Sequence, residues 1–344
     1  MTGDDIPLVF GDSQADAGNA FARAGAPPGS VPQFPANQIT NDDVFATQLG
    51  ASFASGRSFA FADALAQDNI AAADNPFGIA IPGFNAPLAP DGDQIDLFLD
   101  SGLQPAAIKS TIIIVGANDV LDFAVSIDPT DLPSDAEIEA AAASIIGAIT
   151  GGIGRLIGAG LSHFVVMGLP DASRFPDAVE VATQIGIDFG IPALEATIRD
   201  QVLSEFRELS QDFNALLQAA LAGLPAQVDY FDTFGTINGL LDSVEGAPGA
   251  DPVPASLAAI TDTTGACLTD PLDPTTLCAD PAEFFFYDSL HWSEAVHGEL
   301  ARAVEPLLKT HPAPQPVPLP AGGLLLIGGL GALVALRRAR KAAA

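Results

Sequence analysis

The sequence has few basic residues. It holds 13 Lys and Arg against 43 Asp and Glu, which gives a net charge of −30. Four of the basic residues stand within the last eight positions: Arg337, Arg338, Arg340 and Lys341. Nucleic-acid affinity depends on Lys and Arg that neutralise phosphates, so this composition excludes a nucleic-acid-binding protein. Such acidity suits a soluble surface in a salty medium, where screening weakens self-repulsion.

Cysteine is scarce as well, and Cys267 and Cys278 are the only two. Their segment, ACLTDPLDPTTLCADP, is rich in Pro, Asp and Thr and predicts a loop. The pair could form a disulfide in an oxidising compartment, or remain as two free thiols. The sequence has no CxxC pair and no His, Asp and Cys cluster with metal spacing. We therefore expect neither a metal site nor a cofactor.

The C-terminal end has a pattern of its own. Residues 311–320 form a proline-rich spacer, an apolar run of 16 residues extends from Ala321 to Leu336, and the basic cluster follows. A membrane helix needs roughly 20 apolar residues, so this run is slightly short. Because the spacer separates it from the body, we expect a hydrophobic transmembrane helix in the tail 321–344 rather than a buried domain helix. Its basic end would face the cytoplasm.

The tail resembles the bacterial PEP-CTERM sorting signals, in the variant that reads VPLPA. Here this motif runs from Val317 to Ala321. The resemblance implies export, transient anchoring in the inner membrane, and cleavage near the motif by an exosortase-type protease. The start, MTGDDIP, has neither the basic nor the apolar region of a signal peptide. We therefore expect a start further upstream or a leader that has been removed.

The body of the chain predicts an α/β fold. Short apolar segments at residues 7–10, 111–115, 163–167 and 227–231 are typical of strands, and helical patterns cover 135–158, 192–224 and 293–307. Strands that alternate with helices predict a doubly wound, mostly parallel sheet with helices on both faces. We assign residues 1–310 to this domain.

Chemically capable side chains occur at three places in the body. Ser13 follows the first strand in GDSQADAGN, and a serine needs a base to become a nucleophile. Asn118 follows the second strand, where its amide could donate to an oxyanion. Asp288 and His291 lie close together in DSLH, so the carboxylate could orient the imidazole. A helix cap or an Asx turn is the commoner role for such motifs singly, but together they indicate acyl transfer. The other histidines are expected to serve packing or the surface: His163, His297 and His311.

These motifs resemble blocks I, III and V of the GDSL/SGNH hydrolases, in the family's order. QIDLFL (94–99), FVVMGLPD (164–171) and the Phe213-Asn214 pair resemble its lipase-like esterase branch. The resemblance covers about residues 7–308 and implies a flavodoxin-like SGNH fold. By position, Ser13 would be the nucleophile and a backbone oxyanion donor, and His291 the general base. Asp288 would orient His291, and the Asn118 amide would be a further oxyanion donor.

Block II departs from the family pattern N-(F/Y)-A-x-(G/A)-G-A. The best match is SFAFADA at residues 58–64, with Ala62 and Asp63 where two small residues are expected. Both retain a backbone N–H that could complete the oxyanion hole, and Asp tolerates a positive φ better than most residues. Gly56 or Gly83 could fill the role in another register. Two smaller departures are Gln14 in place of leucine after GDS, and DSLHWS in place of DxxHPT.

The resemblance implies an exported serine esterase or lipase at the cell surface that hydrolyses carboxylic esters through an acyl-enzyme. The expected partners are an ester substrate (a lipid or an acylated glycan), the sorting protease, and the membrane through the tail. Two alternatives remain: an O-acetyl esterase of surface polysaccharide, and a non-catalytic surface or matrix protein on the same fold. Substrate specificity would depend on loops at residues 63–69, 75–91 and 242–252.

Overall fold

Parallel strands in the order β1-β2-β3-β4 form the central sheet. The computed structural model describes residues 5–27, 29–52, 54–75, 78–86, 92–126, 133–188 and 190–309. The strands are β1 (Leu8–Gly11), β2 (Thr111–Ile114), β3 (His163–Met167) and β4 (Gln227–Phe231), and a separate parallel pair comprises β5 (Asp262–Ala266) and β6 (Phe284–Phe286).

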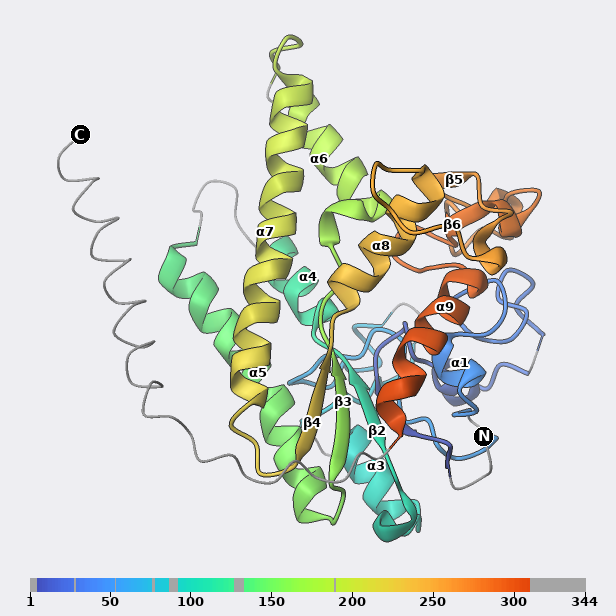
Figure 1. Ribbon diagram of the computed structural model, residues 1–344, viewed down its shortest axis with the longest axis vertical. Coiled ribbons are helices and arrows are strands. Elements are labelled where there is room, and N and C mark those ends of the chain that lie inside the picture. The colour runs from blue at the N-terminus through green and yellow to red at the C-terminus, as the bar shows by residue number, and fades with distance from the viewer. Residues whose placement is uncertain are drawn as a thin grey trace, which may run out of the picture. The chain divides into compact units, whose positions relative to one another are not determined.

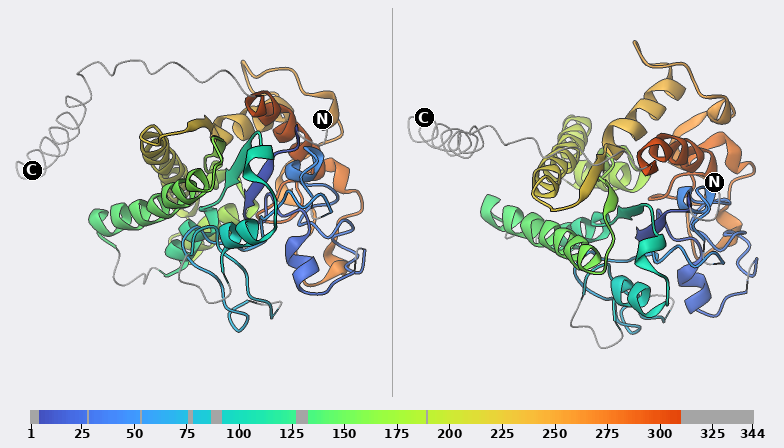
Figure 2. Two further views of the ribbon diagram at one scale, coloured as in Figure 1. Left: turned by 90° about the horizontal axis from the view of Figure 1, so that it is seen from below. Right: turned by 60° about the horizontal axis from the view of Figure 1, so that its bottom comes forward.

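Helices cover both faces of the central sheet (Figures 1 and 2). The α-helices are α1 (Asn19–Arg23), α2 (Phe45–Gln48), α3 (Gln94–Asp100), α4 (Ala117–Ser126), α5 (Asp135–Gly158), α6 (Pro176–Asp188), α7 (Glu195–Leu221), α8 (Thr233–Glu245) and α9 (Glu294–Val304). Short 3-10 helices are η2 (Pro105–Ala107), η3 (Ala172–Arg174), η4 (Ala255–Leu257), η5 (Pro274–Thr276), η6 (Pro281–Glu283) and η7 (Glu305–Leu308).

Successive side chains of each strand enter different cores, because a strand alternates its side chains between two faces. Ile112 and Ile114 pack in the core beneath α2, α8 and α9. Ile113 and Val115 pack in the core beneath α3, α5 and α7. Both faces are therefore buried, which explains the continuous apolar run TIIIV. The predicted parallel sheet flanked by helices is confirmed.

A further segment lies along the outer edge of β1. Val9 donates its N–H to Arg57 O (2.9 Å), and the N–H groups of Phe59 and Phe61 donate to Val9 O (2.8 Å) and Gly11 O (3.0 Å). The chain thus passes from β1 to this edge and then returns across β1 to β2. The direction in which successive strands are added to the sheet therefore reverses between β1 and β2. In open α/β sheets, the ligand crevice lies at the carboxyl ends of the strands where this reversal occurs.

The strand predictions match the structure to within one residue at each end, whereas the helix predictions are less complete. The pattern at 192–224 corresponds to α7, and the pattern at 293–307 to α9 with η7. Helices α6 and α8 and the β5–β6 pair were not predicted. Helix α8 begins where the Asp232 side chain accepts from Gly235 N (2.9 Å) and ends at the left-handed Gly246. The predicted spacer and C-terminal hydrophobic helix lie outside the described residues.

Within the described part of the chain, one segment, Ala136–Gly158 of α5, is long and apolar enough to cross a membrane. Its isoleucines at 145, 149 and 153 are buried against the sheet, in the core shared with α7. Packing in this core accounts for the buried isoleucines of the helix.

Candidate active site

Ser13 lies in the tight turn that follows β1, at the carboxyl edge of the sheet. The turn is close to β2, since Asp12 donates its N–H to Ile114 O (3.1 Å). A Cβ atom at Gly11 would collide with the same carbonyl oxygen, so only glycine fits there. The close approach of the two strands therefore explains the glycine of the GDS motif, and it brings Ser13 to the winding reversal.

Gln94, the first residue of α3, holds this turn through three hydrogen bonds of its side-chain amide. Its Oε1 accepts from Gly11 N (3.0 Å), and its Nε2 donates to Gly11 O (2.8 Å) and Pro82 O (3.1 Å). The side chain is fully buried. The amide therefore satisfies both backbone groups of Gly11 and fixes the position of the nucleophile turn. The sequence pattern QIDLFL marked this residue but did not reveal its role.

The structure brings Ser13, His291 and Asp288 together in one hydrogen-bonded line. Ser13 Oγ is 2.7 Å from His291 Nε2, and His291 Nδ1 is 2.7 and 2.9 Å from the two carboxylate oxygens of Asp288. Asp288 Oδ1 also accepts from Leu290 N and His291 N, both at 2.9 Å. The carboxylate thus fixes the loop as well as the imidazole. With a proton on Nδ1, the Nε2 lone pair faces the hydroxyl, as a general base requires.

The electrostatic surroundings favour the protonated form of His291. Burial acts to lower its pKa, but the Asp288 charge and hydrogen bond, with smaller effects from Asp12 and Asp63, outweigh it and leave the pKa raised above 6.5. An imidazolium that forms during a reaction would be stabilised in the same way. Asp12 is buried, which raises its own pKa to about 7.

Three groups from separate segments are candidate oxyanion donors: the backbone N–H groups of Ser13 and Asp63 and the side-chain amide of Asn118. Among the hydrogen bonds of the described residues, none uses the backbone N–H of Ser13 or of Asp63. Asn118, in the first turn of α4, uses one amide hydrogen on Ala64 O (3.0 Å), and its amide makes no second donor contact among the described residues. These three groups are therefore the candidate donors to an oxyanion.

The Ala62 N–H is not part of this set. It donates to Asp16 Oδ2 (2.9 Å), so the expectation that it could bind an oxyanion is wrong. Asp63 has a left-handed backbone, φ 64°, the conformation that glycine adopts most easily. The Asp63 N–H is therefore the remaining candidate from block II. The Asp63 carboxylate accepts a hydrogen bond from Asn75 Nδ2 (3.2 Å).

Asp16 joins the nucleophile motif to block II, a role that sequence reasoning missed. Besides Ala62 N, its carboxylate accepts from the N–H groups of Gly18 (2.9 Å), Asn19 (2.5 Å) and Ala20 (3.1 Å). Burial raises the pKa of Asp16 to about 6, although these hydrogen bonds lower it. Asn19 Nδ2 extends the link to Ser58 O (3.1 Å). Asp16 and Asn19, the second half of GDSxxDxGN, were the sequence signal that could have indicated this link.

The cysteines and the other described histidines take no part in the Ser13–His291–Asp288 line. Cys267 and Cys278 form a disulfide, and an antiparallel bridge between Leu268 and Leu277 brings them together. His163 contacts Asp229 (3.0 Å) in the sheet. His297 is fully buried and stacks on Phe45. His311 lies outside the described residues.

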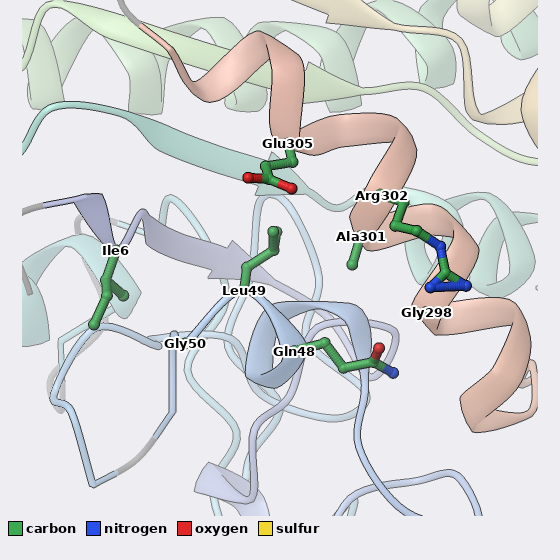
Figure 3. Close-up of a pocket in the computed structure, with 8 residues that line it drawn as sticks. All are labelled: Ile6, Gln48, Leu49, Gly50, Gly298, Ala301, Arg302 and Glu305. Carbon is green, nitrogen blue, oxygen red and sulfur yellow. The ribbon is translucent and has the colours of Figure 1, made fainter. Parts of the chain in front are cut away.

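A surface hollow of about 410 Å³ lies at the opposite end of β1 from Ser13 (Figure 3). Gln48 and Leu49 of the α2 region face Arg302 of α9 and Glu305 of η7 across it, and Ile6 closes one side. None of its lining residues is a Ser, Cys, His or Asp. The hollow therefore does not belong to the candidate active site.

A comparison with protein families agrees with this geometry. The sequence model of the family described as GDSL-like Lipase/Acylhydrolase matches residues 8–304. The match runs from β1 to the end of α9, so the chain belongs to this family and the family resemblance is confirmed. Members are esterase- or lipase-type hydrolases of esters. A search among curated proteins found no match.

Proposed function

We propose that this protein is a serine esterase or lipase that cleaves carboxylic esters through an acyl-enzyme at Ser13. The observation that carries the proposal is the Ser13–His291–Asp288 line, with hydrogen-bonding distances of 2.7 Å at both contacts of the imidazole. Family membership independently supports an ester hydrolase.

In the first half-reaction, Ser13 Oγ attacks the ester carbonyl carbon while His291 Nε2 takes the hydroxyl proton. Asp288 stabilises the imidazolium that results. The carbonyl oxygen becomes an oxyanion, which the N–H groups of Ser13 and Asp63 and the free amide hydrogen of Asn118 bind. His291 then protonates the leaving alcohol oxygen, the ester bond breaks, and the acyl group remains on Ser13.

In the second half-reaction, water takes the place of the alcohol. His291 Nε2 removes a proton from the water as it attacks the acyl carbon, and the same three donors bind the second oxyanion. The proton on His291 returns to Ser13 Oγ as the acyl–oxygen bond breaks. A carboxylic acid is released, and the enzyme regains its starting state. No step uses a group outside this chain except the ester and water.

The test is hydrolysis of p-nitrophenyl acetate, butyrate and a longer acyl ester by the full chain and its Ser13→Ala variant, with folding verified by circular dichroism. We expect turnover by the wild type and a fall of at least about 10⁴-fold in kcat for the variant. A maximum at acetate, with release of acetate from acetylated polysaccharide, would indicate an O-acetyl esterase. Folded wild-type protein that is inert on all these substrates would overturn the proposal and favour a non-catalytic surface protein.

We also propose that the protein is exported and sorted to the cell surface. The VPLPA motif, the apolar run and the basic end support this, as does the Cys267–Cys278 disulfide, since disulfides persist in oxidising compartments. Mass spectrometry of the protein from its native cells tests the proposal. A mature chain that ends near residues 317–321 in the cell-surface fraction is expected. An intact C-terminus on cytoplasmic protein would contradict it.

A further inference from the structure

An acidic hollow of about 290 Å³ lies beside the oxyanion donors, between the loop after Asp63, α4 and α5. The carboxylates of Asp68, Asp119 and Asp122 line it, and apolar walls come from Leu65, Phe123 and Ile145. None of its lining residues is Lys, Arg or His. Its charge is therefore uniformly negative, while much of its surface is apolar.

One of these carboxylates has an oxygen with no visible partner. Asp119 is only 5% exposed, and its Oδ2 accepts from Ala66 N (2.7 Å). Its Oδ1 is buried and has no hydrogen-bond partner among the described residues. Burial raises the pKa of Asp119 to about 6, although nearby backbone N–H groups lower it. A buried carboxylate oxygen without a partner is costly, and a bound cation would offset that cost.

The hollow adjoins the catalytic machinery. Ala64 O accepts from Asn118, and two residues further on Ala66 N donates to Asp119. Two residues of chain span at most roughly 7 Å, so the oxyanion donor and the hollow are close neighbours. The carboxyl of Asp63 experiences the charges of both His291 and Asp122. A group bound in the hollow is therefore within reach of an ester on Ser13.

The shape and chemistry of the hollow indicate which cation fits. The described residues contain no group of three or more His, Cys, Asp or Glu placed to hold a metal ion. A pocket for a whole ligand starts near roughly 300 Å³, so this hollow suits one small head group. Apolar and aromatic walls next to carboxylates favour a weakly hydrated alkylammonium, which gains from both the charge and the ring.

We propose that the hollow is a subsite for an alkylammonium group carried by the ester substrate, so that the enzyme prefers cationic esters. The inference rests on the proposed function, because the subsite acts on a substrate held at Ser13. The reaction is unchanged: water and a cationic ester give a carboxylic acid and an alcohol, one of which retains the ammonium group.

The experiment compares esters that differ in charge but not in shape. One pair is acetylcholine and 3,3-dimethylbutyl acetate, in which a carbon atom replaces the charged nitrogen. The other is p-nitrophenyl 4-(trimethylammonio)butyrate and p-nitrophenyl 5,5-dimethylhexanoate, with the charge on the acyl side. We expect kcat/KM to favour the cationic ester by roughly tenfold in at least one pair. Equal values in both pairs would overturn the subsite while the esterase stands.

Variants then assign the preference to the hollow. Asp68→Asn and Asp122→Asn change exposed side chains, which limits the risk to folding. Each should reduce the cationic-to-neutral ratio several-fold. The matched control, Asp100→Asn, makes the same charge change on an exposed side chain at the opposite end of α3 from Gln94, and should leave the ratio unchanged. A ratio that the control lowers as much as the hollow variants would overturn the assignment.

Direct binding separates the two proposals. Calorimetry with tetramethylammonium chloride on the full chain should show saturable binding that Asp122→Asn weakens, with sodium chloride as the ionic-strength control. If no ester is hydrolysed but this binding is present, the esterase fails and the cation site stands. If no saturable binding is detected and no cationic preference appears, the cation site fails.

Discussion

Gln14 donates a hydrogen bond from Nε2 to the carbonyl oxygen of Leu290 over 2.8 Å. The contact joins the residue after Ser13 to the residue before His291, across 276 positions of sequence. A leucine, the usual residue after GDS in the family, could not donate. The departure from the motif therefore adds a link between the two segments that carry Ser13 and His291.

Replacement of Gln14 by leucine tests this link. We expect kcat to fall several-fold, because the His291 loop loses one of the contacts that hold it against the nucleophile turn. Stability should change by less than about 1.5 kcal/mol, since the lost hydrogen bond is offset by removal of a buried Oε1 that has no partner among the described residues. Kinetics on p-nitrophenyl butyrate and urea unfolding measure both quantities. An unchanged kcat would show that the link has no role in positioning.

The pH dependence of kcat/KM should follow His291, because only its unprotonated form can act as base. Since its pKa is raised above 6.5, activity should fall as the pH drops through a midpoint above that value. Asp63→Asn removes a carboxylate that favours the imidazolium, so it should move the midpoint to lower pH while the backbone N–H is kept. Asp100→Asn, at the exposed end of α3, should leave the midpoint in place. A midpoint below 6.5 in the wild type would contradict this electrostatic assignment.

Asn118→Ala should reduce kcat by roughly 10²- to 10³-fold with little change in KM, because the amide is needed mainly when the oxyanion forms. Asn118 also donates to Ala64 O, so a melting curve must accompany the kinetics. A variant that melts like the wild type but whose KM rises while kcat is retained would place Asn118 in substrate binding instead.

His297 should limit stability in acid. It is buried and its pKa is lowered to about 3 by burial and by the charge of His291, whereas an unfolded histidine titrates near 6.5. The unfolded chain therefore takes up a proton first, so this contribution is complete above 6.5 and is lost as the pH falls toward 3. His297→Phe keeps a ring against Phe45 and removes the proton site. Its urea midpoint should fall less between neutral and acidic pH than that of the wild type, and an equal or larger fall would contradict the assignment.

The strands and the triad were predictable because their signals are local. A β-branched run such as TIIIV has few alternatives to a buried strand, and Ser13, His291 and Asp288 each lie in a short motif. The pairing of residues 57–61 with β1 and the support of Gly11 by Gln94 depend on contacts between distant positions. Neither leaves a periodic pattern in a single sequence.

The candidate oxyanion donors show that sequence-based prediction has the same limit for a single residue. Which N–H of Ala62 and Asp63 faces the substrate depends on the backbone conformation of that turn. The Asp16 carboxylate accepts from Ala62 N, which leaves Asp63 N as the candidate donor. The tolerance of aspartate for positive φ left both positions open, and the sequence did not reveal the contact between Ala62 and Asp16, which stands 46 residues earlier in the chain.

Covalent labelling tests most directly whether Ser13 is a nucleophile activated by His291. A p-nitrophenyl alkylphosphonate should transfer one phosphonyl group per chain and release p-nitrophenolate, with the adduct mapped to Ser13 by peptide mass spectrometry. Ser13→Ala should take up none, and His291→Ala should react far more slowly. A folded wild type that stays unlabelled, or carries the label on another residue, would contradict the account.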